Sequence, residues 1–142
     1  CFGGTKNGLL TTEAVVFFQR ELAREFDYRV KQAGQLAAKM RFAGAQWDAV
    51  LRDGAWLRHA DQANRQARAL AGGLRALGLS LLAPTEANGV FVELAPRVAA
   101  ALEGRGWRFY QFVGEHGYRL MCSWDTREAE IATFLADVRA VL

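Results

Sequence analysis

The sequence predicts an α/β protein in which long helices are followed by a small domain of order ββαββα. Two apolar stripes of helical period run between residues 26 and 78, and alternating strand and helix patterns follow over residues 79–142. The composition is 51% hydrophobic and 23% charged, with two prolines, which supplies a core and excludes disordered or low-complexity chains.

The opening of the chain is rich in glycine and leads into a short apolar run. Gly3, Gly4 and Gly8 surround Lys6. Glycines in such a segment let the backbone approach a ligand closely. The β-branched and aromatic residues of Ala14–Phe18 then predict a buried strand.

Two long helices are predicted next. Apolar residues spaced by three and four predict one helix over residues 26–51, which Asp53-Gly54 interrupts. A second stripe predicts a helix over residues 56–77, with Gly78 in the position just past its end. Both stripes indicate core and subunit packing.

The small domain is predicted from strand runs, a helix-starting proline, a hairpin turn and a capping pattern. Its expected elements are strands over 79–83 and 90–94, a helix over Pro96–Gly104, strands over 107–113 and 118–124 joined at Gly114–Gly117, and a final helix after a capping box at Asp125–Glu128.

Charge is distributed unevenly. Eighteen basic and fifteen acidic residues give +3, and residues 20–75 hold eleven Lys and Arg against six Asp and Glu. The arginines are spread out and interrupted by acids, which indicates a solvated helix surface with room for an anion site, not a nucleic-acid-binding surface. No apolar stretch approaches the roughly 20 residues of a membrane span. We therefore expect neither a nucleic-acid nor a membrane partner.

Two cysteines, Cys1 and Cys122, are too few for a disulfide framework. This favours a reducing, cytoplasmic compartment. The first residue is not methionine, and the opening residues have neither the charged lead nor the apolar run of a signal peptide. We expect the chain to be a soluble piece of a longer protein.

Lys6 is the first candidate for chemistry. A lysine amine can attack a carbonyl, and pyridoxal phosphate enzymes need such a lysine to hold the cofactor as a Schiff base. A Walker loop is excluded, because Gly3-Gly4-Thr5-Lys6 lacks the Gly-x₄-Gly-Lys spacing. A plain surface lysine stays open as the alternative.

Arg119 is the second candidate, in the middle of a predicted strand. An arginine there can present a rigid bidentate fork to a carboxylate. A surface ion pair with Glu93 or Glu115 is an equally good interpretation. Without HxxxH, CxxC or G-x-S-x-G patterns, we expect no protein-built metal site and no serine nucleophile.

Several segments together resemble one family. Phe2-Gly3-Gly4-Thr5-Lys6-Asn7-Gly8, followed by Glu13–Phe18, resembles the cofactor-lysine segment of low-specificity bacterial L-threonine aldolases. These belong to the fold type I, aspartate-aminotransferase-like pyridoxal phosphate enzymes, among the beta-eliminating lyases. The resemblance continues in order along the chain, through Lys31–Leu36, Lys39–Phe42, Glu86–Asn88 and Arg119–Thr126.

The resemblance implies the C-terminal part of a fold type I subunit: residues 1–25 end the large cofactor domain, 26–78 are connecting helices and 79–142 the small domain. Lys6 would be the Schiff-base lysine, and Thr5 would help to place the cofactor. Arg119 would bind the substrate's α-carboxylate. Lys31 and Arg41 would fall near the cofactor phosphate or a neighbouring active site, and their roles stay open.

The resemblance also implies an activity: pyridoxal-phosphate-dependent retro-aldol cleavage of L-threonine and related β-hydroxy-α-amino acids to glycine and an aldehyde. A homodimer or homotetramer with shared active sites would carry it. The family's acid for the pyridine nitrogen and its stacking histidine would lie upstream, so we expect the isolated fragment to be inactive. The alternatives are another fold type I lyase acting by β-elimination, and a non-catalytic α/β interaction or ligand-binding module.

Overall fold

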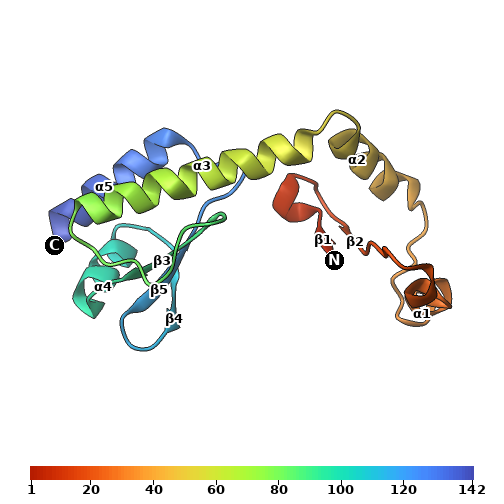
Figure 1. Cartoon of the computed structure of the whole chain (residues 1–142), viewed down its shortest axis with the longest axis horizontal. Helices are drawn as coiled ribbons and strands as arrows, with labels where there is room; N and C mark the ends of the chain where they lie inside the picture. The colour runs from red at the N-terminus through yellow and green to blue at the C-terminus, as the bar shows by residue number, and fades with distance from the viewer. The chain divides into compact units, whose positions relative to one another are not determined.

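The computed structural model describes residues 1–142 as two compact units, Cys1–Leu57 and Arg58–Leu142. Figure 1 shows the course of the chain through both. Each unit is described by itself. No helix in the structure is both long enough and apolar enough to cross a membrane.

The first unit consists of short elements with little core. Strands β1 and β2 pair antiparallel, with Phe2 opposite Ala14 and Gly3 opposite Glu13. The elements in order are β1 (Phe2–Gly3), the 3-10 turn η1 (Thr5–Asn7), β2 (Glu13–Ala14), the 3-10 turn η2 (Arg20–Ala23), α1 (Phe26–Gln32) and α2 (Arg41–Arg52).

The prediction of a buried strand over Ala14–Phe18 is wrong. Only Ala14 lies in a strand, Val16 is 53% exposed and Phe18 is 97% exposed. β1 offers two residues for pairing, so the extended backbone beyond Ala14 has no strand to bond. The run is apolar, but this unit buries none of it fully: Phe17 packs on Phe26, with ring centroids 4.8 Å apart, and is half-buried.

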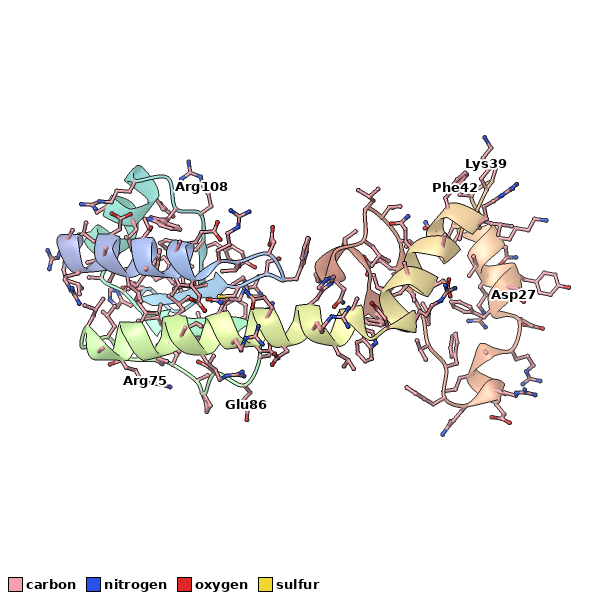
Figure 2. All side chains as sticks on the ribbon, turned by 90° about the horizontal axis from the view of Figure 1, so that it is seen from above. Asp27, Lys39, Phe42, Arg75, Glu86 and Arg108 are labelled. Carbon is pink, nitrogen blue, oxygen red and sulfur yellow. The ribbon has the colours of Figure 1, made fainter.

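The single helix predicted over residues 26–51 is also wrong, because the structure has two helices with a break over residues 33–40. Gly34 (φ +67°) and Lys39 (φ +64°) adopt left-handed backbone conformations, which end a right-handed helix. Figure 2 shows Lys39 and Phe42 projecting outward beside this break.

The second unit is built on the long helix α3 (Ala55–Ala76), whose first turn lies in the first unit. A three-stranded antiparallel sheet has the order β3-β5-β4. The remaining elements are β3 (Gly89–Glu93), α4 (Pro96–Gly104), β4 (Tyr110–Val113), β5 (Gly117–Met121) and α5 (Glu128–Val141). Helices α3 and α5 lie side by side (Figure 1), so closely that a Cβ atom at Gly73 would overlap Leu135.

The two faces of this sheet differ, and the difference positions Arg119. Val90, Val92 and Leu120 point into a core that helices α3, α4 and α5 complete, and all three are at most 5% exposed. Their strand neighbours point the other way because side chains alternate along a strand. Phe91 and Arg119, which are cross-strand partners, therefore share the outer face.

The helices and the sheet of the second unit confirm the mixed α/β class. The helix over Pro96–Gly104 is confirmed, and the predicted second helix corresponds to α3, with Gly78 at φ +82° after its end. The predicted strand over 79–83 shrinks to one bridge between Leu81 and Val92, so the observed order is βαββα plus a bridge.

The predicted capping box is displaced along the chain. Helix α5 begins at Glu128, and the carboxylate that accepts a hydrogen bond from the Arg127 backbone N–H is that of Glu130, at 2.7 Å. Thr126 instead accepts a bond from the Ser123 N–H at 2.8 Å. The motif at Asp125–Glu128 is therefore a turn that leads into the helix.

Candidate functional site

Lys6 lies at the centre of a tight glycine-bounded turn. Gly4 accepts hydrogen bonds from the Asn7 N–H (2.9 Å) and the Leu9 N–H (3.1 Å), and Gly8 closes the turn with φ +91°. Lys6 itself is exposed and makes no hydrogen bond or ion pair within the chain. Its amine is therefore available to an incoming carbonyl.

The backbone of this turn tolerates no side chain at Gly4. A Cβ atom there would overlap the Thr12 carbonyl oxygen and approach Leu9 Cδ2 and Trp47 to 3.0 Å each. Leu9 is the one buried apolar side chain of the first unit, and Trp47 packs against Phe2 with ring centroids 5.0 Å apart and ring planes tilted by 48°. The Lys6 turn is thus fixed from beneath by packing.

A carboxylate that sequence reasoning missed lies beside the turn. Thr5 Oγ1 donates a hydrogen bond to Glu13 Oε1 at 3.1 Å. A Cβ atom at Gly3 would lie 3.0 Å from Glu13 Oε2 and 3.6 Å from Lys6 Cδ, which places both side chains around the same glycine. No local sequence signal points to Glu13, because its position beside Gly3 follows from the pairing of β1 with β2.

Arg119 lies on the outer face of the three-stranded sheet among aromatic rings. Its Cζ atom is 4.6 Å from the centroid of the Tyr110 ring and 5.2 Å from that of Phe112. Neither Glu93 nor Glu115 forms an ion pair with it, so the alternative interpretation of Arg119 has no counterpart in the structure. Arg119 Nε is buried and has no hydrogen-bond partner.

Lys6 belongs to the first unit and Arg119 to the second, so each is placed only within its own unit. Lys31 is exposed in the last turn of α1, and Arg41 is exposed at the first residue of α2.

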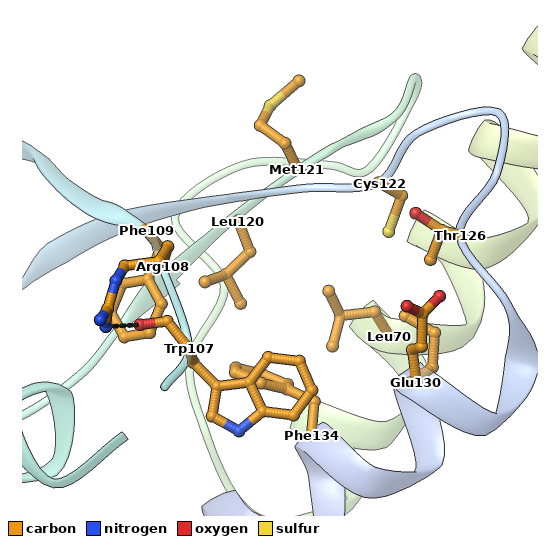
Figure 3. A pocket seen from close by; sticks show the side chains of 11 residues that line it. Leu70, Trp107, Arg108, Phe109, Leu120, Met121, Cys122, Thr126, Glu130 and Phe134 are labelled. Atoms are coloured by element: carbon orange, nitrogen blue, oxygen red, sulfur yellow. Dashed lines mark hydrogen bonds between the residues drawn. The ribbon is translucent and has the colours of Figure 1, made fainter. Parts of the chain in front are cut away.

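A pocket of about 170 Å³ lies in the second unit, with lining residues from α3, α5 and the sheet (Figure 3). Neither Lys6 nor Arg119 lines it. Its wall includes Cys122, and burial raises the pKa of that thiol to about 11. Because the thiolate is the reactive form, Cys122 is poorly suited to nucleophilic chemistry at neutral pH.

Residues 1–97 match the family described as beta-eliminating lyase. The chain belongs to this family. The match includes the Lys6 turn, helices α1, α2 and α3, and strand β3.

Two bacterial proteins are similar to the chain along its whole length. The chain is 54% identical to the low specificity L-threonine aldolase of Pseudomonas sp. (strain NCIMB 10558) and 57% identical to that of Pseudomonas aeruginosa. In each case all of this chain aligns, and it spans 41% of the relative's length.

A solved structure supports the same fold. The structure of Leishmania major threonine aldolase matches with a TM-score of 0.75 at 28% identity, over 82% of this chain and 35% of that one. The resemblance found in the sequence, and the mixed α/β fold it implied, are therefore confirmed.

The residues present fit pyridoxal phosphate. Lys6 offers an unpaired primary amine on a tight turn. At Gly4 of this turn a Cβ atom would overlap the Thr12 carbonyl oxygen. Arg119 offers a guanidinium without a carboxylate partner, and its Nε lacks a hydrogen bond. An aldehyde cofactor and an amino-acid carboxylate are the groups that these two side chains suit.

Proposed function

We propose that this chain is part of a pyridoxal-phosphate-dependent lyase that cleaves L-threonine and related β-hydroxy-α-amino acids to glycine and an aldehyde. The observation that carries the proposal is the glycine-bounded Lys6 turn, within a chain that is more than half identical to two low specificity L-threonine aldolases. A subunit of the relatives' length would carry the activity, because this chain spans 41% of it.

Each candidate residue takes one role in this proposal. Lys6 holds the cofactor through its amine, and Thr5 helps to place it. Arg119 binds the α-carboxylate of the amino acid and so fixes which bond at the α-carbon is aligned for cleavage. The cofactor, when bound, supplies an electron sink for the charge that cleavage leaves at the α-carbon.

Lys6→Ala in the full-length subunit tests the cofactor assignment. The visible absorbance of bound cofactor should disappear, and cleavage of threonine should stop. Arg20→Ala is a matched control, since Arg20 is an exposed cation of the same unit outside the turn. An unchanged spectrum in Lys6→Ala would remove Lys6 from its role.

Arg119→Ala tests the carboxylate-binding role. The variant should keep the colour of the bound cofactor while its KM for threonine rises about 100-fold, as expected for loss of a charge-assisted bidentate contact. An unaltered KM would count against Arg119.

Product analysis separates the candidate reactions. Glycine and acetaldehyde from threonine support retro-aldol cleavage, whereas ammonia and a keto acid would indicate β-elimination by a related lyase. The absence of any product from a cofactor-loaded subunit would favour the non-catalytic module.

We also propose that the enzyme is a cytoplasmic homodimer or homotetramer. The exposed apolar side chains of the first unit support an assembly, since Leu10 and Phe18 are each more than 90% exposed. Sedimentation of the full-length protein tests it, and a monomer would contradict it. The 142 residues alone should show no turnover.

A further inference from the structure

The surroundings of Arg119 are aromatic where an ion pair would be the ordinary arrangement. On the outer face of the sheet, Tyr110 lies directly across from Arg119 in the β4–β5 pairing. The pairing shifts register between Gln111 and Val113, which makes Phe112 the extra residue of a bulge. Both rings lie within 6 Å of the guanidinium carbon, the range of a cation–π contact.

The bulge has a structural requirement of its own. Gly117 lies opposite Val113, and a Cβ atom at Gly117 would overlap the Val113 carbonyl oxygen. β5 therefore needs glycine at position 117, where the backbone of the bulged strand β4 leaves no room for a side chain. The bulge re-aims side chains at this end of the strand, as bulges beside functional sites commonly do.

The burial of Arg119 is uneven along its side chain. Nε is buried and has no hydrogen-bond acceptor. The two terminal nitrogens form no hydrogen bond or ion pair with a protein group. A guanidinium in this state is held by ring contacts and not by fixed acceptors. Its terminal N–H groups remain open to a ligand.

We propose that Tyr110 and Phe112 are positioning residues for the substrate-carboxylate arginine: their rings hold the Arg119 guanidinium so that its terminal N–H pair faces the α-carboxylate. This inference rests on the proposed function for its ligand. It goes beyond that function by assigning two residues that act through Arg119.

The physical reason favours rings over an acidic partner. A carboxylate beside Arg119 would hold the side chain equally well, but it would compete with the substrate for the same N–H groups. Aromatic faces attract the cation without accepting those hydrogen bonds. The arginine is thereby ordered before the substrate arrives, which lowers the entropy cost of binding.

Three variants in the full-length, cofactor-loaded subunit test the proposal: Tyr110→Leu, Phe112→Leu and the double variant. Each single change should raise KM for threonine about 3-fold, and the double change about 10-fold, because one ring contact contributes modestly. kcat should change less than 2-fold, since the contact is the same before and during reaction. Tyr110→Phe keeps the ring and should behave as wild type.

Phe91→Leu is the matched control. Phe91 lies across from Arg119 on β3 and packs on Phe112 at 5.1 Å between centroids, yet it makes no cation–π contact with the arginine. It should leave KM unchanged. An equal rise in KM for Phe91→Leu would overturn the proposal, because general packing of the face would then explain the effect.

Two further readouts separate positioning from structural damage and from failure of the function. Glycine binding, followed by the absorbance of the bound cofactor, should weaken in the double variant. Binding of threoninol, the threonine analogue that has an alcohol in place of the carboxylate, should not weaken. Hydrogen exchange of the Arg119 Nε–H should be slow in wild type and at least 10-fold faster in the double variant.

The outcomes are distinct. If wild type does not cleave threonine but glycine binding and Nε–H exchange respond as expected, the proposed reaction fails and the positioning role stands. If wild type cleaves threonine while glycine binding in the double variant is unchanged, the positioning role is overturned and the function stands. Unchanged Nε–H exchange would also overturn it, whatever the enzyme catalyses.

Discussion

The two units of this chain have similar supplies of apolar residues and use them differently. In Cys1–Leu57, Leu9 is the one buried apolar side chain, while Leu10, Phe18 and Tyr28 are at least 73% exposed. In Arg58–Leu142, residues from three helices and the sheet form one continuous core. Burial, not composition, separates the units.

The difference arises from whether each helix or strand has a neighbour with an apolar face to pack against. α3 and the sheet of the second unit offer each other apolar faces, so each element removes its neighbour's surface from water. The first unit has short elements that bury only Leu9 among its apolar side chains, and many of the others stay exposed to solvent. The second unit should therefore supply nearly all of the chain's intrinsic stability.

Separation of the units should have the largest effect. Residues 55–142, which keep α3 whole, should fold alone with a cooperative thermal transition, whereas residues 1–54 should lack one because they bury too little surface. Circular dichroism of the two peptides measures this. A cooperative transition in residues 1–54 would break the comparison.

The same truncation should cost different amounts in the two units. Leu74 is fully buried, so Leu74→Ala should lower the free energy of unfolding by about 2–5 kcal/mol. Leu10 is 93% exposed, so Leu10→Ala should change it by less than about 0.5 kcal/mol. Urea denaturation of the 142-residue chain decides, and equal effects would contradict the contrast.

Cys122 should make the second unit sensitive to alkali. Burial raises its pKa from 9.0 to about 11, so the unfolded thiol ionises first. Stability should be unaffected below about pH 9 and fall by about 2–3 kcal/mol as pH rises through 11. Cys122→Ala should remove this alkaline loss. In the folded chain at pH 8, a thiol reagent should label exposed Cys1 and spare Cys122.

Asp137 should give a smaller effect in acid. The Trp107 indole N–H, at 2.8 Å, and then Arg105 lower the pKa of this carboxyl below its ordinary value. Its folded pKa is therefore below its unfolded one, so its contribution is complete at neutral pH and is lost as pH falls through the folded pKa.

Asp137→Asn should flatten the acid limb of a stability–pH curve, which Trp107 fluorescence can follow. Asp48 pairs with Arg52 in the first unit, but both side chains are at least 60% exposed, so Asp48→Asn should change nothing measurable. An acid limb that persists in Asp137→Asn would assign it to other groups.

Sequence reasoning succeeded where an element is defined by its own residues. Pro96 and Gly104 mark the ends of α4, and the helical stripe that ends at Gly78 corresponds to α3. It failed at Ala14–Phe18 and at the helix break near Gly34, because a strand needs a partner and a periodic stripe does not reveal a left-handed residue inside it.

The residues of the candidate site also fall into two groups, those that the sequence could name and those that only the structure shows. Lys6 and Arg119 could be named from their local setting and from the family resemblance. Glu13 beside Thr5, and the rings of Tyr110 and Phe112 around Arg119, could not, because those contacts depend on strand pairing and on the β4 bulge.

The sequence by itself determined the α/β class and the long helix α3, which depend on residue types and local spacing, and its resemblance to a known family identified the family. It also supplied Lys6 and Arg119 as candidate site residues. Only the tertiary structure decided which apolar residues are buried, where the first helix breaks and what surrounds Arg119. Burial and the surroundings of Arg119 depend on contacts between residues far apart in the chain, which local pattern does not specify. The helix break follows from left-handed backbone at Gly34 and Lys39, which the apolar spacing does not reveal.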